Sequence, residues 1–469
     1  MYISKKTLLT VVSVILVLSL AIGGTLADLQ DKSEPVVNEF QKHKVVVDLT
    51  ETGTDANGVN NSYSIVPGTE AGKDPMVTVT ATLDSWAFLQ VQDNTEDLVS
   101  FEINDTIWSA LPGYTGVYYK EIQGSTEAQS FYTLKGNDTY PHGVVTYSAD
   151  ITNETMNYDG TNPVNITFTA YAIQKTGFDE AVKAWIYCST GVMASSVTQV
   201  PATATGKQQT QAIAEAVANA DGKDVAVVLA ASEDPIVLPI GLADGNVAIV
   251  GQGADETIID IANYSTTGNG NGSNSNLSIV ITDATIVASD SEDTYWENVS
   301  NAELKNTTFK NCVIDARDSN FSNAFYRGTV TGNVTFEDCT IYADVYAINF
   351  NYVNGILTLR NCDITGWNSF GGATAGNTSK VIVEGCTFHK SGSYGVLRFY
   401  QDAKVSNCTF DDNFDGLDIN ASNVTITIDN CTGLGKPGDA NYKIFDNNGN
   451  HTGYKFIIDG VEYTSVQAW

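Results

Sequence analysis

Residues 334–341 read VTFEDCTI, and near-copies of this eight-residue motif recur along the second half of the chain. The other copies are 307–314 (TTFKNCVI), 357–364 (LTLRNCDI), 381–388 (VIVEGCTF), 403–410 (AKVSNCTF) and 426–433 (ITIDNCTG), with a cysteine-free copy at 279–286 (IVITDATI). A repeat with a period of about two dozen residues is typical of stacked supersecondary units rather than of a single globule.

Within each copy, apolar and polar residues alternate, which is the periodicity of a strand. The residue before the cysteine is Asn, Asp or Gly, and these residues suit a tight turn because they tolerate left-handed backbone angles. In the copy at 334–341, Phe336 is expected to point inward, and Cys339 and Ile341 to point inward again after the turn. Coils of such short strands would stack at the strand spacing of roughly 4.8 Å. The repeat therefore predicts a parallel β-helix.

The cysteines of the motif take the same place in successive coils. They recur every 22 to 27 residues, as Cys312, Cys339, Cys362, Cys386, Cys408 and Cys431. We expect them to form an inward structural ladder of reduced thiols, because a free cysteine behaves as a small buried apolar residue. Disulfides are the alternative, since six cysteines in a secreted chain usually pair. Zinc is disfavoured, because the chain has no Cys-x-x-Cys pair and no nearby His partner.

The start of the chain is expected to be an export signal. Two lysines at 5–6 precede an apolar run over 8–22, and small residues follow at 23–27 (GGTLA). This order is typical of a secretory signal peptide. We expect a signal over 1–27 that is cleaved after Ala27, so that the chain meets a membrane only through this segment before cleavage. An uncleaved anchor is the alternative.

The composition is acidic: 55 Asp and Glu against 24 Lys and Arg give a formal net charge of −31. A nucleic-acid partner is not expected, because phosphates attract Lys and Arg. No cofactor is expected either, although an acidic surface could hold calcium.

Residues 28–190 are expected to form a β-sandwich, because short alternating segments separated by Gly, Asn, Asp and Pro are typical of that architecture. The expected strands are 44–49, 77–82, 86–91, 116–119, 143–147 and 165–173. A short helix over 178–185 would close this domain, with Cys188 just after it.

Three segments of this part, in order, carry a resemblance to a known family. They are the signal segment, VPG at 66–68 followed by KDPMVTV at 73–79, and VNITFTAYAIQK at 164–175 with GFD at 177–179 and AW at 184–185. Residues 1–190 thereby resemble the TasA/camelysin-type matrix fibre proteins. One departure is DLQ at 28–30, where the family often has aromatic residues.

The resemblance implies a jelly-roll-like subunit that is exported by a dedicated signal peptidase. Such subunits can join into fibres when the freed N-terminal arm adds a strand to the next copy, since an incoming strand satisfies the unpaired backbone groups of an open sheet edge. A monomeric spacer domain is the alternative. Some relatives carry a peptidase label, but this chain has no His-Glu-x-x-His zinc motif.

The rest of the chain is divided into a linker over 191–206 and the β-helix with its end caps over 207–469. An amphipathic helix over 208–220 would cover the open end of the β-helix. The segment 251–260 (GQGADETIID) resembles the entry coils of pectate-lyase-like right-handed parallel β-helix proteins. Short strands expected to cover the other end are 443–445, 454–458 and 461–463.

The predicted fold class is therefore all-β. It consists of an N-terminal jelly-roll-like β-sandwich followed by a right-handed parallel β-helix with an N-terminal capping helix.

Aromatic residues crowd the expected coils, and exposed aromatic rings form a suitable platform for sugars. Packing in the core is the alternative for each of them. The carbohydrate-binding candidates are Tyr346, Trp367, Tyr394 and Tyr400.

Acidic residues cluster over 410–418 (FDDNFDGLD). Carboxylate oxygens are ligands for calcium, although acidic turns that face water are the alternative and the spacing is not that of an EF-hand. The calcium candidates are Asp411, Asp412, Asp415 and Asp418. No catalytic residue is assigned, because the Gly-His-Gly element expected of a polygalacturonase-like enzyme is absent and HKSG stands at 389–392 instead.

The sequence thus predicts a secreted protein of the cell surface or extracellular matrix rather than an enzyme. Its β-helix would serve adhesion or carbohydrate binding, and its partners would be further copies of itself in fibres and a carbohydrate or a host or cell-surface ligand. The alternative is a lyase, hydrolase or epimerase that acts on an acidic polysaccharide, because such chemistry uses paired acids or a poised base.

Overall fold

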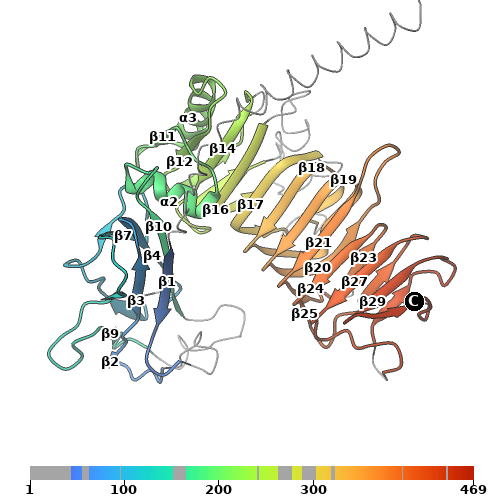
Figure 1. Ribbon diagram of the computed structural model, residues 1–469, viewed down its shortest axis with the longest axis horizontal. Coiled ribbons are helices and arrows are strands. Elements are labelled where there is room, and N and C mark those ends of the chain that lie inside the picture. The colour runs from blue at the N-terminus through green and yellow to red at the C-terminus, as the bar shows by residue number, and fades with distance from the viewer. Residues whose placement is uncertain are drawn as a thin grey trace, which may run out of the picture. The chain divides into compact units, whose positions relative to one another are not determined.

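The computed structural model describes a β-sandwich and a β-helix joined in one chain (Figure 1). The described residues are 44–54, 63–95, 97–151, 165–239, 242–261, 277–287, 303–317, 323–392, 395–439 and 442–468. The predicted signal segment and the arm after it lie outside these ranges. Within them, no helix combines the length and apolar character needed to span a membrane.

The first part of the chain folds as an antiparallel sandwich. Its strands are β1 (Val45–Thr50), β2 (Glu70–Gly72), β3 (Met76–Ala81), β4 (Ser85–Asp93), β5 (Val99–Phe101), β6 (Ser109–Ala110), β7 (Val117–Ile122), β8 (Gln129–Tyr132), β9 (Val144–Tyr147) and β10 (Ile166–Gln174). Its three sheets have the strand orders β1-β3-β8, β10-β4-β7-β6 and β2-β9-β5. Val77 and Val79 of β3 pack with Leu89 of β4 in a fully buried core between the first two of these sheets.

Helix α2 (Ala181–Thr190) follows the sandwich and ends later than the predicted helix over 178–185. Cys188 consequently lies inside the helix and not after it, which corrects the prediction. The helix ends where Gly191 adopts a left-handed conformation, with a φ of 75°. Inside the helix, Trp185 packs against Phe88 of β4, with ring centroids 5.4 Å apart.

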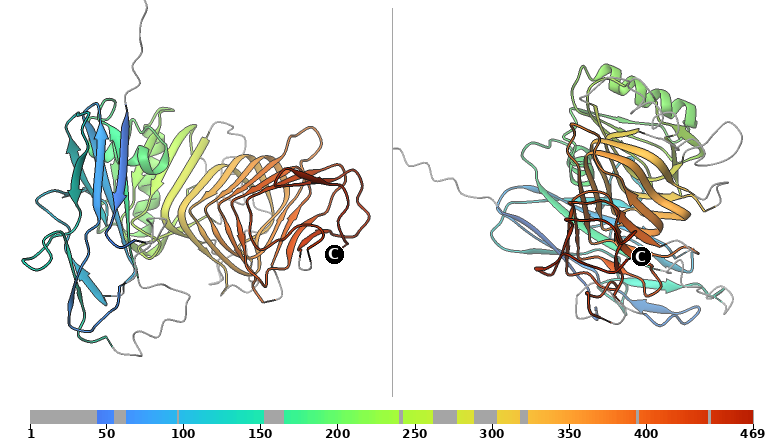
Figure 2. Two further views of the ribbon diagram at one scale, coloured as in Figure 1. Left: turned by 60° about the horizontal axis from the view of Figure 1, so that its bottom comes forward. Right: turned by 90° about the vertical axis from the view of Figure 1, so that its right-hand side faces the viewer.

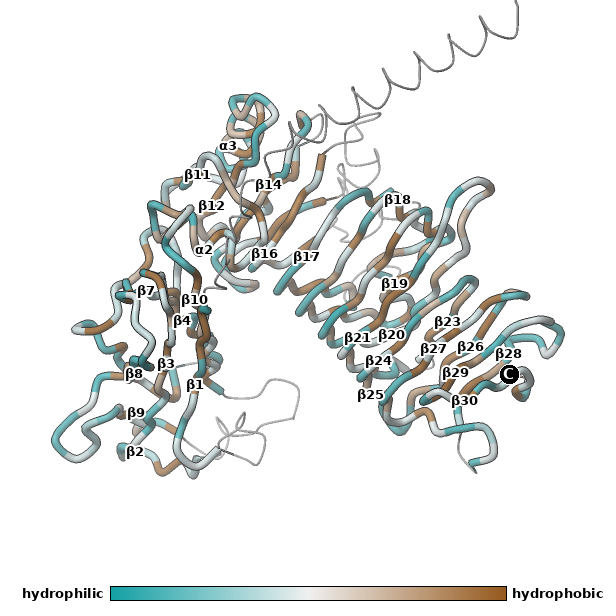
Figure 3. Tube along the Cα trace, in the orientation of Figure 1, coloured by the Kyte–Doolittle hydropathy of each residue, from teal (hydrophilic) through white to brown (hydrophobic). Residues whose placement is uncertain are grey.

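The second part is a parallel β-helix whose coils stack side by side (Figure 2). Its strands are β11 (Ser196–Gln199), β12 (Val225–Val228), β13 (Ser232–Val237), β14 (Gly245–Val250), β15 (Thr257–Asp260), β16 (Leu277–Val287), β17 (Glu303–Asp315), β18 (Phe325–Glu337), β19 (Thr340–Arg360), β20 (Asp363–Phe370), β21 (Lys380–Glu384), β22 (Thr387–His389), β23 (Val396–Phe399), β24 (Ala403–Ser406), β25 (Thr409–Phe410), β26 (Gly416–Ile419), β27 (Thr425–Asp429), β28 (Ile444–Asp446), β29 (Lys455–Ile458) and β30 (Val461–Tyr463). In the strands of the repeated motif, such as β18, hydrophobic and hydrophilic residues alternate (Figure 3), as the motif predicts.

Equivalent residues of the repeated motif lie one above another. Phe309, Phe336 and Leu359 are paired in register from coil to coil, and all three are fully buried. The residue before each ladder cysteine has a φ between 49° and 67°, which confirms the predicted left-handed turn. Several of these turns are joined by side chains, as where Asn361 Nδ2 donates to Asp338 Oδ1 at 3.1 Å.

Helix α3 (Gly206–Asn219) covers the first coils and confirms the predicted capping helix. Thr205 caps its N-terminus together with Gln208, whose side chain bonds back to the Thr205 backbone. Ile213 and Val217 are buried in the apolar core of the β-helix. The fully buried Gln209 side chain accepts from Ala230 N at 2.9 Å and so fixes the helix to the first coil.

The segment 191–206 is more than a linker. Within it, Ser196–Gln199 forms β11, which pairs in parallel with β12 as the first strand of the large sheet. At the other end, β28 and β29 continue the parallel stack and β30 pairs antiparallel with β29. The short terminal strands predicted there are therefore present.

Candidate functional site: the outer face of the β-helix

An aromatic column runs over the outer face of the β-helix. Tyr346 of β19 stands in register with Trp367 of β20, so their side chains stack with ring centroids 5.0 Å apart and 26° between the ring planes. Tyr326 of β18 lies next to Tyr346, with the two ring centroids 5.2 Å apart. We call Tyr326, Tyr346 and Trp367 the aromatic column. All three side chains are half-buried, so part of each ring meets solvent.

A guanidinium group lies against each end of the aromatic column. The Arg327 Cζ lies 4.8 Å from the centroid of the Tyr326 ring, and the Arg398 Cζ lies 4.9 Å from the centroid of the Trp367 ring. Arg398 is held in turn by Asp418, to which it donates from Nε at 2.9 Å and from Nη2 at 2.8 Å. Burial raises the pKa of Asp418, and Arg398 opposes that rise. The Trp367 end of the column is therefore fixed, because Arg398 is held by Asp418 and Trp367 stacks on Tyr346.

The structure brings together two of the four predicted carbohydrate-binding residues. Tyr346 and Trp367 belong to the column, whereas the Tyr400 hydroxyl accepts from Asn420 Nδ2 at 2.7 Å, outside the stack. Tyr394 lies outside the described residues. Sequence reasoning missed Tyr326 and Arg398. An alignment of outward-facing positions between coils could have found Tyr326, because it precedes Tyr346 by roughly one period.

The four calcium candidates do not converge on one point. Asp411 pairs with His389, Asp415 pairs with Lys390, and Asp418 pairs with Arg398. Asp412 is exposed, and its backbone carbonyl accepts from Lys443 Nζ at 2.6 Å. Across the described ranges, no three His, Cys, Asp or Glu side chains are grouped so that they could hold a metal ion.

His389 bridges two carboxylates from neighbouring coils. Its Nε2 lies 3.0 Å from Asp363 Oδ1, and its Nδ1 lies 2.7 Å from Asp411 Oδ2. Asp363, and then Asp411, raise the pKa of His389 to about 9. The imidazole is therefore protonated at neutral pH and works as a charged clamp between coils rather than as a general base, which needs a pKa near the operating pH.

The six motif cysteines lie at equivalent turns, and the structure has all seven cysteines as free thiols. Cys339 is 1% exposed, and its Sγ lies 3.4 Å from the carbonyl of Phe309 in the previous coil. Burial raises the pKa of the Cys339 thiol, so the group stays protonated and unreactive.

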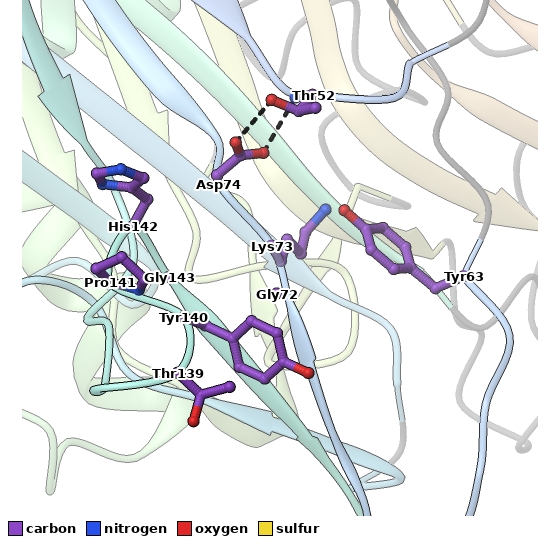
Figure 4. A pocket seen from close by; sticks show the side chains of 10 residues that line it. All are labelled: Thr52, Tyr63, Gly72, Lys73, Asp74, Thr139, Tyr140, Pro141, His142 and Gly143. Carbon is purple, nitrogen blue, oxygen red and sulfur yellow. Dashed lines mark hydrogen bonds between the residues drawn. The ribbon is translucent and has the colours of Figure 1, made fainter.

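A separate pocket of about 370 Å³ lies on the sandwich (Figure 4). On one side, Thr52 donates to Asp74 from its backbone N at 3.0 Å and from its Oγ1 at 2.7 Å. Lys73 lies deeper and is paired with Glu51 at 2.9 Å, which neutralises its charge. The pocket therefore offers the Asp74 carboxylate and polar and aromatic groups, with Tyr140 and His142 on its opposite side.

Comparisons with known proteins bear on the second part of the chain. Residues 248–438 match a family model described as a right handed beta helix region. No curated protein matches the chain. Full-length QnrB1, a plasmid-mediated fluoroquinolone resistance protein, is 18% identical over 46% of this chain and 93% of its own, with a TM-score of 0.20. The catalytic unit of a thermostable GH87 alpha-1,3-glucanase from Streptomyces thermodiastaticus is 12% identical over 88% of this chain and 96% of its own, also with a TM-score of 0.20. Neither structural likeness carries a functional argument; the family match confirms a right-handed β-helix.

Proposed function

We propose that this protein is exported to the cell surface or extracellular matrix, where its β-helix displays the aromatic column to a carbohydrate. The column itself carries the proposal: it is half exposed, its Tyr326 and Tyr346 rings meet in a tilted contact with centroids 5.2 Å apart, and its Tyr346 and Trp367 rings stack at 5.0 Å. A surface fixed in this way loses little side-chain freedom on binding. Because neighbouring rings cover much of each ring face, the ring edges and the Arg327 guanidinium would make the contacts.

Binding of the purified protein to a panel of polysaccharides tests the proposal. Replacing both Tyr346 and Trp367 by Ala should weaken binding about tenfold or more, since interface aromatic anchors carry much of the binding energy. Tyr352→Ala is the matched control, because Tyr352 is 48% exposed and lies outside the column. Unchanged binding by the double variant would refute carbohydrate contact at the column.

The same panel distinguishes the enzymatic alternative. Shortening of a uronic polymer by the wild-type protein, lost in Asp412→Asn and Asp415→Asn, would favour a lyase or hydrolase. Binding of a polysaccharide by the wild-type protein without cleavage of the polymer would favour a binding role for the β-helix.

We further propose that the exported chain joins into fibres through its N-terminal arm, which rests on the resemblance of residues 1–190 to matrix fibre proteins. Deletion of residues 28–38 should leave soluble monomers after export. Electron microscopy of the purified deletion variant checks this, and filaments like those of the wild type would exclude the arm as the connecting strand.

A further inference from the structure

Residues 44–469 form one compact unit that contains both the sandwich and the β-helix. A second cavity, of about 540 Å³, lies in this unit where the sandwich, α2 and the early coils adjoin. The sandwich lines it with residues around the ends of β4 and β7, and α2 contributes Trp185. The β-helix contributes the loop 251–256 and the turn residues Asp283, Asn311 and Asp338.

The wall of this cavity is held in place by one side chain. Gln252 Oε1 accepts from the backbone N of Thr115 at 3.0 Å. Its Nε2 donates to the carbonyls of Gly113 at 2.8 Å and Leu229 at 2.6 Å. Segments more than 100 residues apart in the sequence are thus hydrogen-bonded to one another at the cavity, so the positions of its walls are fixed.

Two lining residues have buried polar atoms that find no partner among the described residues. Trp185 is 1% exposed, and its Nε1–H donates to no acceptor. The hydroxyl of Tyr114 is likewise buried and unpaired. A buried donor that stays unpaired lowers stability, so both groups suit a ligand that brings hydrogen-bond acceptors into the cavity.

The acidic lining of the cavity indicates the charge of its ligand. The cavity is lined by the carboxylates Asp93, Asp255, Glu256, Asp283 and Asp338, and its lining includes no Lys, Arg or His. Carboxylates and aromatic faces together favour an organic cation. A metal ion fits less well, because the described residues contain no metal-binding group of His, Cys, Asp and Glu side chains.

We propose that this cavity binds a protonated amino sugar. Its ammonium group would pair with the carboxylates on the β-helix side, Asp338 among them, and its hydroxyl oxygens would accept from Trp185 Nε1–H and from the Tyr114 hydroxyl. The site is independent of the aromatic column, so either proposal can fail without the other.

Calorimetric titration with glucosamine, and with N-acetylglucosamine as the uncharged partner, tests the proposal. Glucosamine should bind, and the acetylated sugar should bind at least about tenfold more weakly, because acetylation removes the positive charge. Absence of glucosamine binding, or equal binding of the two sugars, would overturn the assignment.

Two variants locate the site without disturbing the fold. Tyr114→Phe removes only an unpaired hydroxyl, and Asp338→Asn keeps an oxygen that can accept from Asn361. Each should weaken glucosamine binding several-fold or more at an unchanged melting temperature, whereas Asp412→Asn, at an exposed position outside the cavity, should leave binding unaltered. Wild-type affinity in both cavity variants would place the sugar elsewhere and refute the proposal.

Discussion

At the scale of the residue, the position before each ladder cysteine sets the turn of the coil. Asn361 has a φ of 52° and donates to Asp338. Asn361→Ala should lower the free energy of unfolding by about 1–3 kcal/mol, because an alanine pays the cost of the left-handed conformation and the hydrogen bond is lost. Urea denaturation measures the change.

Asn361→Gly is the matched control, since Gly385 takes this position in the next coil with a φ of 67°. Glycine adopts the conformation without the steric cost, so this variant should be less destabilised than the alanine variant. A glycine variant as unstable as the alanine variant would show that backbone strain is not the cause.

His389 gives a second prediction at this scale. Its pKa in the fold is about 9, above the ordinary value of 6.5, so the protonated form stabilises the fold. This contribution is fully present below about pH 6.5 and is lost as the pH rises through about 9. The stability difference between wild type and His389→Gln should therefore shrink over this range in denaturation curves. A difference that stays constant with pH would contradict the clamp.

At the scale of the element, α3 closes the apolar end of the β-helix. Ile213 is fully buried among core residues, so Ile213→Ala should cost about 2–5 kcal/mol of stability. Lys207→Ala on the exposed side of the same helix is the control and should change stability little. Thermal unfolding of the three proteins checks the prediction; equal melting temperatures for Ile213→Ala and wild type would mean that the helix does not cap the core.

Elements with strong periodicity were predictable, and weakly patterned ones were not. All six strands expected in the sandwich are present, whereas β6 is two residues long and exposed and so leaves no alternating pattern. The sequence does not indicate β11, because SVTQ resembles the linker sequence around it and its pairing with β12 depends on a partner further along the chain. The end of α2 was placed too early, although Gly191 offered a stop signal.

The candidate site was predictable only in part, because it depends on register between coils. Tyr346 and Trp367 stood out as aromatic residues in the repeat, but their stacking follows from the pairing of β19 with β20. The acidic residues at 411–418 form one cluster in the sequence. In the structure these residues contact different partners, because side chains along β26 and the turn before it point in different directions. Asp418 pairs with Arg398, and Asp415 pairs with Lys390.

At the scale of the whole molecule, the repeat builds a core in which each coil covers the next. Buried side chains such as Phe336 and Leu359 each contribute about 1.5–3 kcal/mol from burial alone, and in a solenoid these contributions come mainly from neighbouring coils. The motif cysteines occupy equivalent positions in successive coils of this core, so the reactivity of their thiols tests whether the coils stack in this way.

Thiol mapping of the native protein by mass spectrometry tests the arrangement most directly. The inward stacking of the repeat predicts free thiols at all six ladder positions. It also predicts that the buried five, Cys312 to Cys408, resist alkylation until the protein is unfolded, while the half-buried Cys431 is modified first. Disulfides between coils, or rapid labelling of Cys339 and Cys362 in the folded protein, would contradict it.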